Sequence, residues 1–237
     1  MKILSIDCSA VSASVAILDD NKILSSSYSN VGLTHSQTLM PMLDSTLKNA
    51  RIELSDIDYF AINVGPGSFT GIRIGVAALK GLTEFDEANC FAVSTLESIA
   101  YNLKGIFNGV VVSAMDARCG QVYTATFEIT GDVVTRLTED DAVLIEDLAE
   151  NLKGIKKDII FVGDGATLCY NILKEKVECI SLAPEHLLYQ NAVGVARVAR
   201  DQIAQGKAPI KSEDIMPFYL RVPQAERELK KRQENEQ

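Results

Sequence analysis

The stretch from Gly65 to Gly75 constrains the fold more than any other part of the chain. The apolar run before it, residues 59–64, predicts a buried strand. Pro66 stands between two glycines and predicts a tight turn, because proline fixes φ and glycine reaches angles that other residues avoid. Ser68 is placed to cap the helix that follows, and the pattern extends this helix to about Leu82.

Two stripes run along this expected helix. The apolar stripe consists of Ile72, Val76 and Leu79. The other stripe consists of the small residues Gly71, Gly75 and Ala78. A glycine inside a helix costs about 1 kcal/mol relative to alanine, so two on one stripe need an explanation. The helix is either buried on both sides within its own domain or, as we favour, offers the small stripe to the backbone of another subunit.

The same glycines do not form a nucleotide fingerprint. Their spacing is G-x-G-x-x-x-G, one residue longer than the dinucleotide-binding motif. The chain also has no G-x-x-x-x-G-K-[ST] sequence. As a nucleotide signal the glycine loop is therefore weak.

Composition and charge limit the class of protein. The 237 residues suffice for one large domain or two small ones, and no apolar run approaches the roughly 18 residues that a membrane span requires. An acidic residue already at position 7 argues against a signal peptide and predicts a cytoplasmic protein without a membrane partner. A net charge of −9 argues against a chain that binds nucleic acid by itself, so a partner would have to hold most of any RNA. Five scattered cysteines predict reduced thiols and no zinc site.

The pattern of expected elements occurs twice along the chain. Strands are expected at residues 2–8, 13–18, 22–28, 58–64 and 90–93, and again at 109–116, 121–129, 133–137 and 158–162. Helices are expected at 34–50, 69–82, 94–103 and 145–152, and after Gly165. Thr34 with Gln37 and Ser94 with Glu97 each fit a capping box.

Two details support a duplication. The first strand of each half ends in an aspartate, Asp7 and Asp116, and a later strand of each half ends in Gly-x-Gly. The sequence therefore predicts an α/β fold of two β-β-β-α-β-α lobes. We expect an N-terminal lobe at residues 1–106 that carries the partner-binding helices, a C-terminal lobe at 107–222, and a frayed, charged tail at 223–237.

Several sequence blocks, spread over nearly the whole chain, resemble one family. They are Ile3 to Asp7, His35-Ser36, Gly65 to Gly75, Val93 to Leu96, Asp116 to Arg118, Gly120 to Tyr123 and Tyr219 to Arg221. The blocks resemble the TsaB (YeaZ) family of the ASKHA superfamily, which has the ribonuclease H-like fold of actin, the 70-kDa heat-shock ATPases and sugar kinases. The resemblance implies a non-catalytic subunit that binds and stabilises TsaD, with TsaE as third subunit. That complex forms N6-threonylcarbamoyladenosine at position 37 of tRNAs that read codons beginning with A.

The chain departs from its catalytic relative at the metal site. An H-x-x-x-H pair holds the metal in that relative, whereas the corresponding positions here are Thr95 and Ile99, and isoleucine cannot ligate a metal. The resemblance therefore implies no metal and no catalytic residue in this chain. Glu97, between the two positions, is explained as the far end of a capping box.

The phosphate loop of the ATP-using relatives also differs. Asp-x-Gly is replaced by Asp7-Cys8-Ser9, without the glycine that lets backbone amides close on a phosphate. The chain is therefore expected to hold no cofactor of its own, with ATP or ADP only at the interface of the complex, near Asp7, Ser9 and Arg118. Asp7 and Asp116 either position a metal–nucleotide complex or, as we favour, accept backbone hydrogen bonds in turns.

The resemblance places the partner surface on the helices at 34–50 and 69–82, which would form a bundle with homologous helices of TsaD. The expected interface residues are Gly71, Ile74, Gly75, Ala78, His35, Leu39 and Met42. Alone, the chain is expected to form a homodimer through this surface, since a large exposed apolar surface is usually buried against a partner. Gly75→Leu is expected to abolish pairing with TsaD and to leave the fold intact.

Two other functions stay open. A small-molecule kinase or ATPase of the same fold would bind ATP tightly between the lobes and turn it over. A peptidase would use His35 and Ser36, but neighbouring helix positions do not face each other, and neither an orienting acid nor an oxyanion hole can be located. His35 is more simply a helix-start or interface residue.

Overall fold

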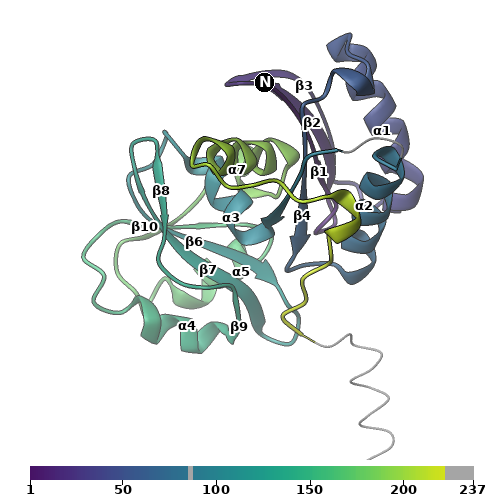
Figure 1. Cartoon of the computed structure of the whole chain (residues 1–237). Helices are drawn as coiled ribbons and strands as arrows, with labels where there is room; N and C mark the ends of the chain where they lie inside the picture. Colours follow the sequence, from purple (N-terminus) through teal and green to yellow (C-terminus); the bar gives the residue numbers. More distant parts are fainter. Residues whose placement is uncertain (85–87, 222–237) are drawn as a thin grey trace, which may run out of the picture.

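Two β-sheets with the same internal order form the frame of the molecule in a computed structural model that describes residues 1–84 and 88–221 (Figure 1). The first sheet has the order β3-β2-β1-β4-β5. Its strands are β1 (Lys2–Asp7), β2 (Ala13–Asp19), β3 (Lys22–Ser29), β4 (Tyr59–Gly65) and β5 (Cys90–Ser94). β1, β2 and β3 are antiparallel neighbours, whereas β4 and β5 run parallel to β1.

The second sheet repeats this order as β8-β7-β6-β10-β11. Its strands are β6 (Gly109–Asp116), β7 (Gln121–Thr130), β8 (Val133–Arg136), β10 (Ile159–Val162) and β11 (Ile180–Leu182). The short strand β9 (Asp141–Leu144) also pairs with β7. The duplicated α/β fold is thereby confirmed, although β9 and β11 were not predicted.

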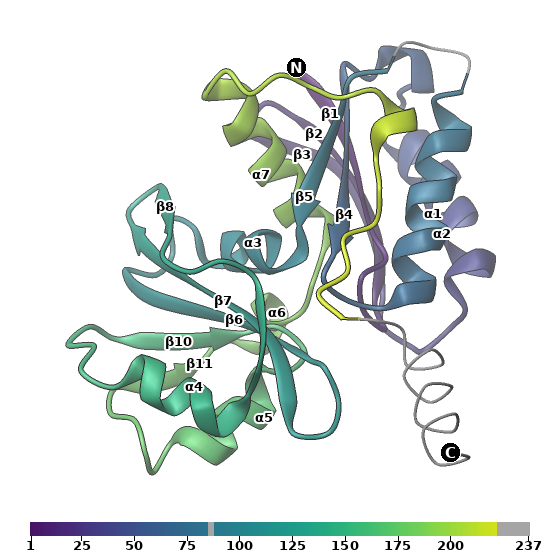
Figure 2. The same ribbon diagram turned by 60° about the horizontal axis from the view of Figure 1, so that its bottom comes forward.

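Helices cover both faces of the first sheet. α1 (His35–Ala50) and α2 (Phe69–Leu82) pack on one face, and α7 (Ala192–Ala204) packs on the other (Figure 2). Side chains of β1 alternate between the two faces of the sheet. Leu4 and Ile6 join the core under α1 and α2, and Ile3 joins the core under α7. β1 is therefore buried on both sides, as its apolar sequence requires.

The two lobes exchange helices where they meet. α3 (Thr95–Ala100) follows β5, yet its Leu96 and Ile99 belong to the core of the second sheet. α7 follows the second sheet in the chain, yet it packs on the first. The remaining helices of the second lobe are α4 (Ile145–Leu152), α5 (Ala166–Leu173) and α6 (Glu185–Leu188). A division of the chain at residue 106 did not anticipate this exchange.

The segment after α7 also returns to the first sheet. Cys90 and Ile210 exchange backbone hydrogen bonds of 3.0 and 2.9 Å, and the chain then passes α2 toward the second lobe (Figure 2). Short 3-10 turns lie at Leu54–Asp56, Tyr101–Leu103 and Ser212–Asp214. The charged tail expected at 223–237 lies outside the described residues. Within residues 1–84 and 88–221, no helix is both long enough and apolar enough to cross a membrane.

The helix starts fall at the predicted residues, but not always for the predicted reason. Ser68 Oγ accepts the backbone N–H of Gly71 at 3.2 Å, which confirms it as the cap of α2. Thr34 stands at the start of α1, but its side chain makes no capping hydrogen bond, so the predicted box with Gln37 is wrong. Its backbone carbonyl instead accepts the N–H of Gln37 at 2.9 Å.

Candidate functional site

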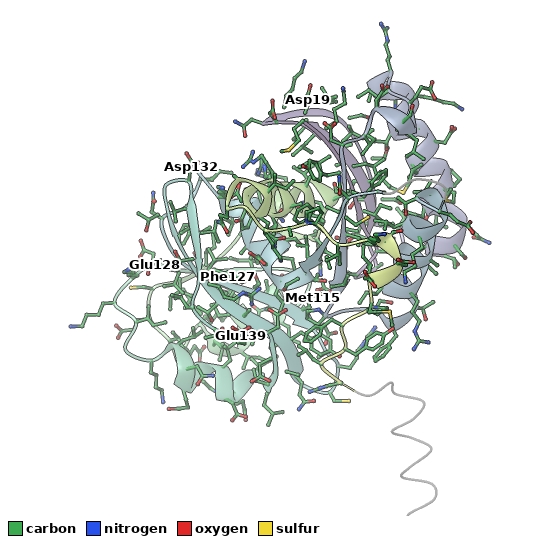
Figure 3. The ribbon with its side chains drawn as sticks, in the orientation of Figure 1. Asp19, Met115, Phe127, Glu128, Asp132 and Glu139 are labelled. Atoms are coloured by element: carbon green, nitrogen blue, oxygen red, sulfur yellow. The ribbon has the colours of Figure 1, made fainter. Side chains whose placement is uncertain are left out.

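A cleft of about 540 Å³ opens between the lobes at the carboxyl ends of β1 and β6. The first lobe contributes the turn after β1 and the starts of α1 and α2, and the second lobe contributes the turn after β6. Met115, labelled in Figure 3, lies in the wall at the end of β6. Five of the residues expected to be functional line this cleft, namely Ser9, His35, Gly71, Ile74 and Arg118.

The aspartates at the two strand ends make the same turn in each lobe. Asp7 Oδ1 accepts hydrogen bonds from the backbone N–H of Ser9 at 2.9 Å and from its hydroxyl at 2.6 Å. Asp116 Oδ1 accepts one from the backbone N–H of Arg118 at 2.8 Å. Both carboxylates therefore hold the chain in a turn, as the favoured interpretation expected.

Asp7 lies beneath the cleft and not in its wall. Its side chain is fully buried, and its Oδ2 has no hydrogen-bond partner among the described residues. Burial raises the pKa of Asp7, and the hydrogen bonds from Ser9 offset this only in part. Of these residues, Arg118 is exposed in the cleft wall, whereas Ser9 and Asp7 are fully buried.

The charges in the cleft do not suit a polyphosphate. Among the described lining residues, Arg118 carries the one permanent positive charge, and the lining also includes the carboxylates of Asp116 and Asp164. Gln190 donates to Asp164 Oδ1 at 2.7 Å, so this carboxylate is also held in place. A nucleotide would need further cations from outside the chain to bind here tightly.

Gly71 and Gly75 face the interior of their own lobe. A Cβ atom on Gly71 would come within 2.1 Å of the carbonyl oxygen of Cys8. One on Gly75 would lie 3.2 Å from Ile62 and 3.5 Å from the Cβ of Cys8. The two glycines let the end of β1 pass under α2, which corrects the expectation that they admit another subunit. Gly75→Leu would disturb the core of the lobe, so it cannot serve as a test of pairing.

The outward face of α2 is formed by the neighbouring positions. Ile74 and Ala78 are half-buried, and Ala77 and Gly81 are exposed. Ile74 and Ala78 also pack in part against the core of the lobe, and Thr70 and Arg73 are exposed on the same helix. Of the expected interface residues on α2, Ile74 and Ala78 therefore reach the surface.

α1 presents fewer of its expected interface residues. Leu39 is buried in the core and Met42 is half-buried, whereas the neighbouring Met40 is exposed. His35 is nearly buried, and its Nε2 donates to the carbonyl oxygen of Ala10 at 2.8 Å. This bond ties the start of α1 to the turn after β1, and it leaves Nε2 unavailable as a base for Ser36.

Exposed apolar side chains surround the mouth of the cleft on the first-lobe side. Val11 and Leu33 are 58% and 55% exposed and line the cleft with Ile74. We call these three residues the apolar rim. Val31 and Met40 are also exposed nearby in the chain. Val11 and Leu33 lie in turns, where hydrophobic periodicity gives no signal, so the sequence analysis did not single them out.

The two positions that the resemblance aligns with the metal ligands of the catalytic relative are not accessible to solvent. Thr95 and Ile99 are fully buried. Ser94 Oγ accepts the N–H of Glu97 at 3.3 Å, but the Glu97 carboxylate lies 3.6 Å from Arg136 of β8, so its predicted role in a capping box is wrong. Among the described residues, no group of three or more His, Cys, Asp or Glu side chains could hold a metal ion.

The duplicated sheets and the cleft between them define a protein with the ASKHA fold. Residues 29–229 match the family model described as TsaD, tRNA N6-adenosine threonylcarbamoyltransferase. The chain belongs to this family and, within it, to the TsaB (YeaZ) group.

Individual relatives support this placement. The chain is 31% identical to the Escherichia coli (strain K12) protein named tRNA threonylcarbamoyladenosine biosynthesis protein TsaB, over 93% of this chain and 95% of that protein. It is 28% identical to the protein of the same name from Bacillus subtilis (strain 168), over 95% and 96%. A Pseudomonas aeruginosa structure described as similar to the peptidase YEAZ superposes with a TM-score of 0.80 at 27% identity, covering 93% of this chain and 99% of that one.

Proposed function

We propose that this chain acts in tRNA threonylcarbamoyladenosine biosynthesis as a non-catalytic subunit that binds and stabilises TsaD. The chain matches relatives over nearly their whole length, and these relatives are named for that biosynthesis. The family model that it matches is named for the transferase. The observation that carries the proposal is the outward face of α2, where small and apolar residues continue into the apolar rim of the cleft.

Such a face suits another helix. Ala77, Ala78 and Gly81 lack long side chains, so a partner helix could approach the α2 backbone closely. Val11, Leu33 and Ile74 would bury further apolar area beside it. TsaD shares the family model, so it would offer a related pair of helices. The same surface would pair two copies of this chain when TsaD is absent.

The non-catalytic role is supported by the chemistry of the site. Buried Thr95 and Ile99 replace the metal ligands, and the cleft carries more carboxylates than cations. TsaD would therefore supply the metal and the transfer step, and TsaE would join as third subunit. ATP or ADP would be held at the junction of the subunits. This chain would contact tRNA only indirectly, through the complex, in the cytoplasm.

Titration calorimetry with TsaD from the same organism tests the interface. Ala77→Glu places a charge on the exposed face of α2 without changing the core, and it should weaken binding by about tenfold or more. Ala204→Glu is the matched control, since Ala204 is also exposed near a helix end but lies on α7. Equal affinity of both variants and the wild type would refute the assigned face.

A further inference from the structure

The last described residues form a strap that contacts a cleft-lining residue of each lobe. We define the strap as residues 215–221, drawn in yellow in Figure 2 between α2 and the second lobe. Ile215 anchors it in the core under α1 and α2, where it is fully buried. The backbone N–H of Phe218 then donates to the carbonyl oxygen of Val64 at the end of β4, at 2.7 Å. The strap is thus fixed to the first lobe before it reaches the cleft.

Tyr219 of the strap packs against the first-lobe wall of the cleft. Its ring stacks on Phe69, with centroids 4.3 Å apart and an interplanar angle of 21°. Phe69 opens α2 and lines the cleft. The hydroxyl of Tyr219 accepts a hydrogen bond of 2.8 Å from Arg73 Nε, and Arg73 is exposed on α2. Tyr219 therefore contacts both the cleft wall and the exposed surface of α2.

Arg221, two residues later, contacts the second-lobe wall of the cleft. Its guanidinium lies 5.7 Å from the ring centroid of Tyr123, which also lines the cleft. It donates hydrogen bonds to the carbonyl oxygen of Ala117 and to the side chain of Gln121. Cation–π contacts and hydrogen bonds from charged donors both stabilise folded proteins. The strap therefore joins one cleft-lining aromatic ring of each lobe.

We propose that the strap is a clamp that sets the opening of the cleft and couples it to the partner face of α2. A partner that docks on α2 meets Arg73 and so acts on Tyr219, and any movement of Tyr219 is passed within two residues to Arg221 and the second lobe. This coupling rests on the function proposed above, whereas the clamp itself does not. The strap includes the block Tyr219 to Arg221, to which the family resemblance assigned no role.

Single-molecule fluorescence on the full chain tests the clamp at concentrations where the chain is monomeric. Dyes are placed on the two lobes at exposed positions through Ser45→Cys and Asn171→Cys, after Cys119→Ser and Cys179→Ser remove the exposed thiols. The wild type should give one narrow transfer efficiency. Arg221→Met should add a second or broader population, and Gln121→Met should do the same from the other side of the contact.

The matched control is Arg51→Met, which removes an exposed arginine at the end of α1 and should leave the distribution unchanged. An unchanged distribution in both Arg221→Met and Gln121→Met, with circular dichroism showing folded chains, would overturn the clamp.

Affinity for TsaD tests the coupling. If only clamped molecules bind, the dissociation constant of Arg221→Met should rise by the inverse of the clamped fraction seen by fluorescence, about threefold to tenfold for clamped fractions of about 30% to 10%. An open cleft with unchanged affinity would overturn the coupling and leave the clamp. Unchanged affinity of Ala77→Glu would instead refute the assigned face of α2, absence of binding by the wild type would refute the proposed function, and neither result would affect the fluorescence test.

Discussion

The backbone N–H of Ser68 donates to the carbonyl oxygen of Ser9 at 2.7 Å, so the cap of α2 is fastened to the turn after β1. Gly71 lies one turn further along, against the carbonyl oxygen of Cys8. Two consecutive carbonyls at the end of β1 thus meet the first turn of α2. The position of α2 is set by this backbone contact, which leaves no room for a side chain at residue 71.

Gly71→Ala should therefore destabilise the chain, although alanine is the better helix residue. The added Cβ would force α2 away from β1, and overpacking of this kind costs about 1–3 kcal/mol. Gly81→Ala is the matched control on the same helix, because nothing lies within 4 Å of the added atom. That variant should be slightly more stable than wild type, by about 0.4–1 kcal/mol. Urea unfolding of both variants measures the difference, and equal stability would contradict the close contact.

Helical and strand periods predicted most of the architecture. Ile72, Val76 and Leu79 are buried in α2 as their spacing indicated. The exchange of α3 and α7 could not be predicted in this way, because a periodic pattern shows that one helix face is buried but not against which sheet. β9 and β11 have only four and three residues and contain no run of four apolar residues, whereas the similarly short β10 was predicted from its run of four apolar residues.

The site was predicted less completely than the fold, for a related reason. A glycine in a helix marks a close approach of another backbone, and the signal is the same whether that backbone belongs to β1 or to a second subunit. In this chain Gly71 and Gly75 allow the close approach of the end of β1. The turns at Asp7 and Asp116 were predictable, since aspartate two residues before an N–H is a local pattern.

The buried charge of Asp7 should make stability depend on pH. Folding raises the pKa of Asp7, so the contribution of its protonated form to stability is fully present below the unfolded pKa and is lost as pH rises through the folded pKa. Asp7→Asn keeps the size of the side chain and an oxygen that accepts from Ser9. The variant should gain stability relative to wild type as pH rises from acidic to neutral.

Thermal melts over that pH range measure the effect. Glu175→Gln, which neutralises an exposed carboxylate, serves as the control and should follow the wild-type curve closely. Lower stability of Asp7→Asn at neutral pH would show that the charged carboxylate is needed, against the expected sign.

The five cysteines should divide into two reactivity classes. Cys119 and Cys179 are exposed, whereas Cys8, Cys90 and Cys169 are buried. Burial raises the pKa of Cys90 to about 11 and that of Cys169 to about 12, and it raises the pKa of Cys8 as well. Since the thiolate is the reacting form, a disulfide reagent should titrate two thiols quickly in the native chain and all five in denaturant. A third fast thiol in the native chain would contradict the described packing.

The exchange of helices between the lobes predicts the effect of Gly194→Ala. Gly194 lies in α7, where alanine is normally favoured over glycine by about 1 kcal/mol. The added Cβ would come within 2.3 Å of the carbonyl oxygen of Ser98 in α3, so the two helices would have to separate. We expect a net loss of about 1–3 kcal/mol in urea unfolding, opposite in sign to the helix propensity. A gain in stability would show that α3 and α7 do not touch in solution, and the lobe junction would then depend on the strap instead.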